Sequence, residues 1–477
     1  MPERQGATRW VLAIMLLLGA CGSTSPDRVA LPAPVPAIAP ESADLGPADG
    51  DAVVAAPFAG AERAALGTPT ERDGLAASTL ASSPDAKVDE ILAELKTEAP
   101  VPASGPPIVA PDRGAAAALV AARPPGTAVG YLLIDLESGQ ALAELNPDLP
   151  LIPASTAKLA TAVVALDVLG PEHRYRTELL ARGAIEAGVL HGDLILRGGG
   201  DPALDVADLL ELVVRLENHG VHYVNGRFLV DDSVLPRFSE IAPGQPPEAA
   251  YNPGIGALSL AFNRVRVAWR GGGRIDAATL PPLHEATFEG APPGLLPPGG
   301  VQLARDDGHA VIWRVADRGR RRQMTELPVK DPGLHAGYVF RELAGAQGIS
   351  LTPPLRGVAP AGAYVLAVHD SIPLRYLVRD MLLYSNNMMA ETIGLSAAAR
   401  LGDVSGGLGA AGVLLLGHLA RLMPEVDWQG AALGNQSGLD GTGRLTPRQL
   451  AAIVRYGWQS EALPALLPGG GWSGTLI

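Results

Sequence analysis

The order of hydrophobic and polar positions divides the 477-residue chain into three parts. A short, purely apolar run comes first, at residues 10–18. Residues 22–114 follow, with many alanines, 14 prolines and little aromatic surface. From residue 115 onward, segments with strand and helix patterns succeed one another, so we expect the folded part of the protein to begin there.

Residues 115–180 have the pattern of a helix, two strands and a second helix. Residues 128–136 and 141–145 are apolar runs of strand length, and residues 137–140 between them predict a hairpin turn. The following segment, from about residue 153 to Gly170, is apolar on nearly every side, which predicts a buried helix. Gly170 and the proline after it predict the end of that helix.

Residues 375–400 form a second long apolar pattern, which predicts one continuous helix. A polar group, Tyr384-Ser385-Asn386-Asn387, interrupts its middle. Buried serine and asparagine side chains are costly unless they have hydrogen-bond partners. We therefore expect these side chains to take part in a site.

The N-terminus has the pattern of a secretory signal, since Arg4 and Arg9 precede the apolar run and small residues follow it. Nine apolar residues are too few for a helix that spans a bilayer. Residues 18–21, Leu-Gly-Ala-Cys, resemble the lipobox of bacterial lipoproteins, in which the cysteine becomes the lipidated N-terminus. We expect a signal peptide at residues 1–21, lipidation of Cys21 and anchoring in the periplasm. We expect the outer membrane to hold the anchor, because Gly22 and not aspartate comes directly after the cysteine. The alternative is an ordinary signal peptide with a chance cysteine.

The spacer at residues 22–114 cannot bury enough apolar area to order itself, so we expect it to be disordered. It holds 14 acidic and 6 basic residues, so it supplies most of the net charge of −13. That charge argues against a nucleic-acid partner. The single cysteine excludes an intramolecular disulfide and a four-cysteine zinc site.

Lysine is rare in this chain, and one of its four lysines lies beside a serine. Ser155 and Lys158 are three residues apart on the predicted buried helix and share a face. A serine hydroxyl needs an adjacent base to become a good nucleophile, and burial lets a lysine serve as that base by lowering its pKa. The alternative is a lysine that extends from a core helix to solvent.

Ser385 and Asn387 strengthen the catalytic interpretation. The Ser-x-Asn pattern supplies a hydroxyl that can relay a proton and an amide that can hold both a lysine and a substrate carbonyl. Ser-x-x-Lys followed by Ser-x-Asn matches the first two signatures of the penicillin-binding serine enzymes.

The chain resembles the class C low-molecular-weight penicillin-binding proteins, the D-alanyl-D-alanine carboxypeptidase/endopeptidase group, over about residues 115–476. Beyond the two signatures, five further segments resemble that family in order and spacing: residues 198–202, 229–233, 257–263, 437–439 and 444–447.

The resemblance implies an α/β serine β-lactamase/transpeptidase-like domain at residues 115–180 and 365–477, with an inserted, mostly β region at residues 181–364. Ser155 is expected to attack the penultimate D-alanine carbonyl of a peptidoglycan stem peptide. Lys158 is expected to take its proton, and Ser385 and Asn387 to shuttle protons and hold the substrate. The resemblance implies β-lactam antibiotics as acylating inhibitors and no cofactor. The alternatives are a non-catalytic wall-binding protein or fragment, and a β-lactamase or esterase that uses the same serine.

The third signature of that family, Lys-Thr-Gly, is not found, since no lysine follows Lys330. The final residues resemble the segment that precedes this signature. We therefore expect the catalytic domain to be incomplete at its C-terminus and the activity of this exact chain to be in doubt.

Two other patterns are set aside. Residues 407–412 fit G-x-G-x-x-G but join two helical segments, so they do not predict a dinucleotide site. The nine histidines show no H-E-x-x-H spacing, which disfavours the zincins, and we expect no metal site.

Overall fold

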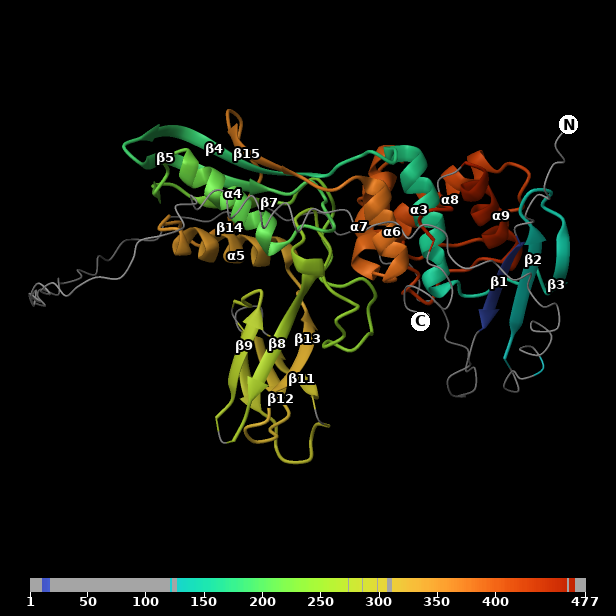
Figure 1. The fold of residues 1–477 in the computed structure, drawn as a ribbon, viewed down its shortest axis with the longest axis horizontal. Helices are drawn as coiled ribbons and strands as arrows, with labels where there is room; N and C mark the ends of the chain where they lie inside the picture. The colour runs from blue at the N-terminus through green and yellow to red at the C-terminus, as the bar shows by residue number, and fades with distance from the viewer. Residues whose placement is uncertain are drawn as a thin grey trace, which may run out of the picture. The chain divides into compact units, whose positions relative to one another are not determined.

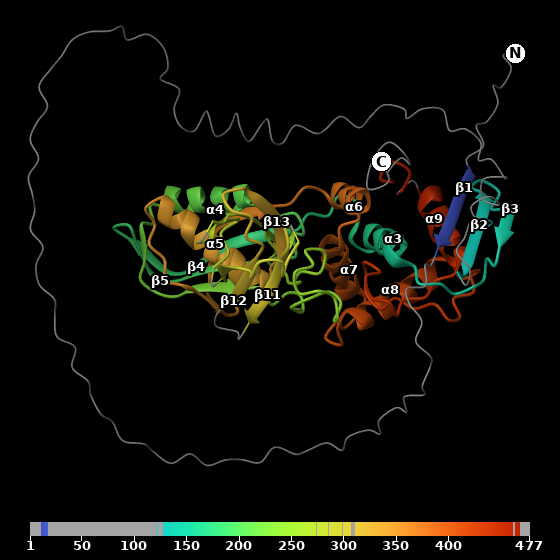
Figure 2. The same ribbon diagram turned by 90° about the horizontal axis from the view of Figure 1, so that it is seen from below.

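The computed structural model describes residues 11–17, 121 and 127–467, except positions 273, 285, 298, 307–310, 461 and 462. Figures 1 and 2 show these residues as ribbons. Cys21, the spacer at 22–114, the tail from residue 468 and, except for Ala121, the helix expected before residue 127 lie outside the described residues. Among the helices that are described, none is long and apolar enough to cross a membrane.

The predicted hairpin forms between strands β2 (Val129–Asp135) and β3 (Ala141–Leu145). Asp135 fixes its turn, because its Oδ1 accepts hydrogen bonds from both the backbone N–H and the hydroxyl of Ser138, each at 2.9 Å. Strand β1 (Val11–Leu17), from the apolar run near the N-terminus, pairs antiparallel with the other side of β2. The result is a three-stranded sheet in the order β1-β2-β3.

Helices form the core of the part that carries the predicted site. They are α3 (Ala157–Leu169), α6 (Leu374–Leu383), α7 (Asn387–Leu401), α8 (Leu408–Leu422) and α9 (Pro447–Gln459). Helix α3 contacts each of the other four, and α9 contacts strands β1 and β2 (Figure 1). Nine of the thirteen residues of α3 are buried, which confirms the buried helix that its apolar pattern predicts. Gly170 ends it with a φ of +86°.

The prediction of one continuous helix over residues 375–400 is wrong, because α6 ends at Leu383 and a separate helix, α7, begins at Asn387. Ser385 has a φ of +52°, in the left-handed region that a helix cannot continue through. Asn386 then caps α7, since its side chain accepts a hydrogen bond from the backbone N–H of Met389. Asparagine competes for the backbone in this way, so the polar group acts as a helix boundary.

A six-stranded sheet forms the larger part of the inserted region. Its order is β14-β7-β5-β4-β15, with β6 beside β5. The strands are β4 (Arg176–Glu186), β5 (Val189–Arg197), β6 (Tyr223–Val224), β7 (Phe228–Asp231), β14 (Pro354–Arg356) and β15 (Tyr364–Asp370). Helices α4 (Val206–Asn218) and α5 (Pro332–Ala346) pack together with it in one apolar cluster (Figure 1).

Two three-stranded sheets complete this region, in the orders β13-β8-β9 and β10-β12-β11. Their strands are β8 (Arg264–Arg270), β9 (Asp276–Leu280), β10 (Ala286–Gly290), β11 (Val301–Asp306), β12 (Val311–Val315) and β13 (Gln323–Pro328). A short 3₁₀ turn, η2 (Ala261–Asn263), leads into β8. The buried indoles of Trp269 and Trp313 belong to the apolar cluster of these strands.

The six-stranded sheet begins and ends slightly outside the boundaries drawn from the sequence. Strand β4 starts at Arg176 and β15 ends at Asp370, whereas we placed the insertion at residues 181–364. The two strands pair antiparallel with each other, so one sheet fixes both ends of the insertion.

Candidate active site

Ser155 lies just before the N-terminal end of the buried helix α3. It belongs to the 3₁₀ turn η1 (Ala154–Thr156), and α3 begins two residues later at Ala157. The hydroxyl of Thr156 closes this turn with a 2.6 Å hydrogen bond to the carbonyl of Pro153. Ser155 is exposed, so its hydroxyl is accessible to a substrate.

Lys158 is the opposite case, a lysine that is only 1% exposed. Its Nζ donates three hydrogen bonds: to Ser155 Oγ at 3.1 Å, to Asn387 Oδ1 at 2.8 Å and to the backbone carbonyl of Ser437 at 3.0 Å. These use all three donors of an ammonium group. The alternative that Lys158 extends to solvent is therefore excluded by its position.

Ser385 and Asn387 come from the break between α6 and α7 and complete the group. Ser385 Oγ donates to Ser155 Oγ at 2.9 Å, across 230 positions of the sequence. The Asn387 amide accepts from Lys158 with its oxygen and donates with its Nδ2 to the carbonyl of Tyr251 at 3.1 Å. All four residues that we predicted for the site are thus in contact.

Glu391 is a fifth member of this group that the sequence analysis missed. It lies one turn after Asn387 on α7 and is fully buried. Its two carboxylate oxygens accept the backbone N–H groups of Gln436 at 3.0 Å and Ser437 at 2.8 Å. The sequence did contain a sign of its role, since Glu391 is the only charged residue between Met388 and Ala399, in a run whose other residues have the pattern of a buried helix.

Burial shifts the pKa values of Lys158 and Glu391 in opposite directions. Burial lowers the pKa of Lys158 from 10.5 to about 8, and the Glu391 carboxylate acts against that change. Burial raises the pKa of Glu391 to about 7, against its hydrogen bonds from Gln436 and Ser437 and the charge of Lys158. A lysine with a pKa near 8 holds a substantial neutral fraction close to neutral pH and can act as a base.

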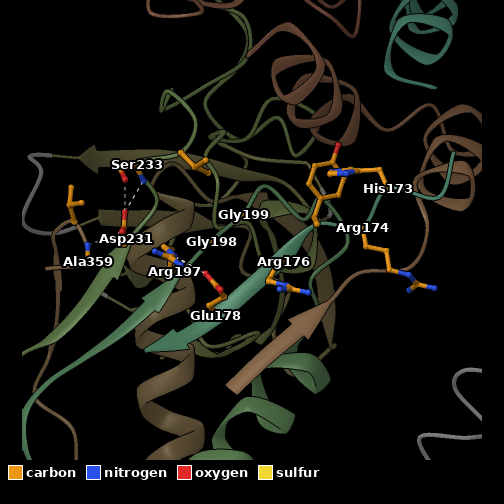
Figure 3. A pocket seen from close by; sticks show the side chains of 13 residues that line it. His173, Arg174, Arg176, Glu178, Arg197, Gly198, Gly199, Asp231, Ser233 and Ala359 are labelled. Atoms are coloured by element: carbon orange, nitrogen blue, oxygen red, sulfur yellow. Dashed lines mark hydrogen bonds and ion pairs between the residues drawn. The ribbon is translucent and has the colours of Figure 1, made fainter. Parts of the chain in front are cut away.

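A separate cavity of about 510 Å³ is lined mainly by residues of strands β4, β5 and β7 and the segments beside them (Figure 3). Three arginines line it, but each already has an acceptor. Arg197 pairs with Glu178, Arg176 pairs with Asp370, and Arg174 donates to a backbone carbonyl. Carboxylates match the charges of Arg176 and Arg197, and a backbone carbonyl holds Arg174, so we assign no anion site to this cavity.

Solved structures identify the fold. A crystal structure of penicillin binding protein 4 from Haemophilus influenzae matches with a TM-score of 0.61 and 22% identity, over 72% of this chain and 78% of that one. A structure of the same protein with a bound β-lactam matches with a TM-score of 0.59 and 21% identity, again over 72% and 78%. The fold is that of the penicillin-recognising serine enzymes, which confirms the predicted fold class.

Sequence comparison identifies the family. The profile of the D-Ala-D-Ala carboxypeptidase 3 (S13) family matches residues 115–291 and 310–477. A carboxypeptidase of Mycobacterium tuberculosis is 31% identical over 372 residues, 76% of this chain and 68% of that protein. A D-alanyl-D-alanine carboxypeptidase of an Actinomadura species is 27% identical, over 66% and 61%. The chain belongs to the D-Ala-D-Ala carboxypeptidase 3 (S13) family, so the resemblance drawn from its motifs is confirmed.

Proposed function

We propose that the protein is a serine-type D-Ala-D-Ala carboxypeptidase/endopeptidase that acts on peptidoglycan stem peptides through an acyl-enzyme on Ser155. The observation that carries this proposal is the contact between Lys158 and Ser155. An exposed hydroxyl lies 3.1 Å from a buried amine whose pKa is lowered to about 8. A nucleophile within hydrogen-bond reach of an activated base is the minimum apparatus for acyl transfer.

The proposed reaction begins with neutral Lys158, which takes the proton of Ser155 as Oγ attacks the penultimate D-alanine carbonyl. Ser385, hydrogen-bonded to the same oxygen, offers a route by which that proton reaches the leaving amine. The peptide C–N bond breaks and the amine leaves with the proton. Water then hydrolyses the ester, which releases the shortened peptide and returns the serine hydroxyl.

Asn387 positions the base in this scheme. Its Oδ1 holds Lys158 while its Nδ2 is engaged by the carbonyl of Tyr251. The amide orientation is thereby fixed from both sides, so the lysine nitrogen remains directed at Ser155. A fixed orientation of the reacting groups is itself a large part of enzymatic rate enhancement.

Labelling with a fluorescent penicillin tests the assignment. β-Lactams are expected to acylate Ser155, and a β-lactam complex is known for the Haemophilus influenzae protein. The full chain should be labelled, Ser155→Ala should not, and Ser405→Ala, a matched change of an exposed serine in a loop, should be labelled normally. Labelling that persists in Ser155→Ala contradicts the nucleophile assignment.

The same experiment separates the other two functions considered for this fold. Absence of labelling in the unchanged chain supports a non-catalytic wall-binding protein. Rapid loss of the label, with release of hydrolysed penicillin, supports a β-lactamase. A second assay, with peptide substrates, distinguishes the two peptidase activities. Release of D-alanine from a stem pentapeptide supports the carboxypeptidase, and cleavage of cross-linked stem peptides supports the endopeptidase.

We further propose that the leader is cleaved before Cys21, that Cys21 is lipidated and that the protein is held in the periplasm, at the outer membrane. On this proposal strand β1 (Val11–Leu17) belongs to the uncleaved chain only. The support is the sequence Leu-Gly-Ala-Cys at residues 18–21 after a basic and apolar leader. Metabolic labelling with a fatty acid should mark the unchanged protein and leave Cys21→Ser unmarked. A Cys21→Ser protein that still fractionates with membranes contradicts the anchor.

A further inference from the structure

Helix α4 and strand β15 bring together two carboxylates and one imidazole, away from Ser155. Asp208 and Glu211 lie three residues apart on α4, and His369 lies near the end of β15. His369 Nδ1 is 3.6 Å from Asp208 Oδ1 and 4.0 Å from Glu211 Oε2. One ligand atom from each residue lies within 4.8 Å of the other two.

The second oxygen of each carboxylate is already used. Asp208 Oδ2 accepts the backbone N–H of Asp205 in the capping box of α4. Glu211 Oε1 pairs with Arg215, one turn further along the same helix. Each carboxylate is therefore held by one oxygen while its other oxygen faces His369, which is the arrangement that single-oxygen metal ligation needs.

A fourth residue orients the imidazole. Asp201, only 2% exposed, places Oδ2 3.6 Å from His369 Nε2, on the far side of the ring from the two carboxylates of α4. A carboxylate that faces the second ring nitrogen of a histidine is the usual partner of a metal-ligating imidazole, because it favours the tautomer whose other nitrogen is unprotonated. Here that other nitrogen is Nδ1, which faces Asp208 and Glu211.

A buried hydroxyl independently indicates a missing ligand. Thr177 of β4 is 1% exposed, and its Oγ1 has no hydrogen-bond partner among the residues that the structure describes. The antiparallel register pairs Thr177 with His369, so both side chains project from the same face of the sheet. Buried polar groups are rarely left without partners, and a water bound to an ion in this cluster would supply one.

We propose that Asp208, Glu211 and His369 form a binding site for a divalent first-row transition metal ion, with Zn²⁺ as the favoured occupant. One imidazole and two carboxylate oxygens suit such an ion, with bonds of about 2.0–2.2 Å. Bonds of that length require ligand atoms roughly 3–4 Å apart, and both distances from His369 Nδ1 fall in that range. Thr177 then binds a metal-held water, and Asp201 remains outside the coordination shell.

The role of this site is structural. The ion joins α4 to β15, the last strand of the inserted region, which leads through Ser371 into α6. The catalytic group comes instead from η1, α3, α7 and the turn between α6 and α7. The metal site is therefore independent of the proposed peptidase mechanism. The sequence analysis did not find it, because more than 150 positions separate His369 from Asp208 and Glu211.

Calorimetric titration of the EDTA-treated, dialysed full chain with Zn²⁺ tests this proposal. The unchanged protein should bind one Zn²⁺ tightly. His369→Asn should lose this binding, and Asp201→Asn should weaken it by about 10- to 100-fold, as removal of an orienting carboxylate does elsewhere. His222→Asn, a change of an exposed histidine in the same region, is the matched control and should bind like the unchanged protein.

Glu211→Gln serves as a second variant in case His369→Asn does not fold, since Glu211 lies on the partly exposed face of α4. It should also lose tight binding while its circular dichroism spectrum stays unchanged. The proposal is overturned if the unchanged chain binds no Zn²⁺ at micromolar concentrations. It is equally overturned if folded His369→Asn or Glu211→Gln binds Zn²⁺ as the unchanged chain does.

Discussion

The Glu391 carboxylate accepts the backbone N–H of Ser437 at 2.8 Å, and the carbonyl of the same Ser437 accepts from Lys158 at 3.0 Å. One buried residue thus fixes the position of the backbone that holds the base, and its charge also acts on the pKa of that base. Glu391 touches no reacting atom, so we regard it as a positioning residue.

Glu391→Gln should shift the pH profile of acylation toward acid. The negative charge of Glu391 raises the pKa of Lys158. Without that charge the lysine pKa falls below about 8, so neutral lysine persists to lower pH. Glutamine has one acceptor oxygen for two backbone N–H groups, so the free energy of unfolding should also fall by about 1–3 kcal/mol. The measurement is the penicillin acylation rate from pH 5 to 10, with exposed Glu425→Gln as control. A profile unchanged in position assigns Glu391 a purely structural role.

The unchanged enzyme should show a single rising limb in the same experiment. Lys158 acts as base only when neutral, so the acylation rate constant should increase as the pH passes through about 8 and level off above it. A rate that stays low through pH 8 and is still rising at pH 10, as the ordinary lysine pKa of 10.5 requires, would mean that burial does not activate Lys158.

Much of this site could be predicted because its signals are local. The apolar run before Gly170 predicts a buried helix, and a lysine three residues from a serine must share its face. The break at Ser385 was missed because it depends on a left-handed backbone conformation that the apolar pattern on either side conceals. Glu391 was missed because its partners, Gln436 and Ser437, lie 45 and 46 positions away.

Two substitutions of Ser385, by glycine and by alanine, should differ in stability but lose the same activity. A serine at a φ of +52° carries strain of about 1–3 kcal/mol, which glycine avoids. Ser385→Gly should therefore be more stable than Ser385→Ala, although both lack the hydroxyl next to Ser155. Both should acylate about 100-fold more slowly than the unchanged protein. Chemical denaturation and acylation rates check this pair; acylation at the unchanged rate in either variant removes Ser385 from the mechanism.

Gly438 should tolerate no side chain. It has a φ of +75°, and a Cβ there would lie 1.8 Å from the carbonyl oxygen of Ala154, beside the nucleophile. Gly438→Ala should lower the free energy of unfolding by more than about 2 kcal/mol, because a steric clash adds to the 1–2 kcal/mol of a left-handed alanine. Gly430→Ala is the matched control, with a φ of +76° and open space around it. Equal losses in the two variants would show that the approach to Ala154 is not tight.

Mass spectrometry of the penicillin adduct tests the central claim most directly. The full chain is incubated with penicillin, quenched in acid, digested and mapped by fragmentation. The account predicts one penicilloyl group per chain, attached to Ser155. An adduct on Ser385 or any other residue, or no adduct at a pH above 8 where Lys158 is mostly neutral, would contradict it.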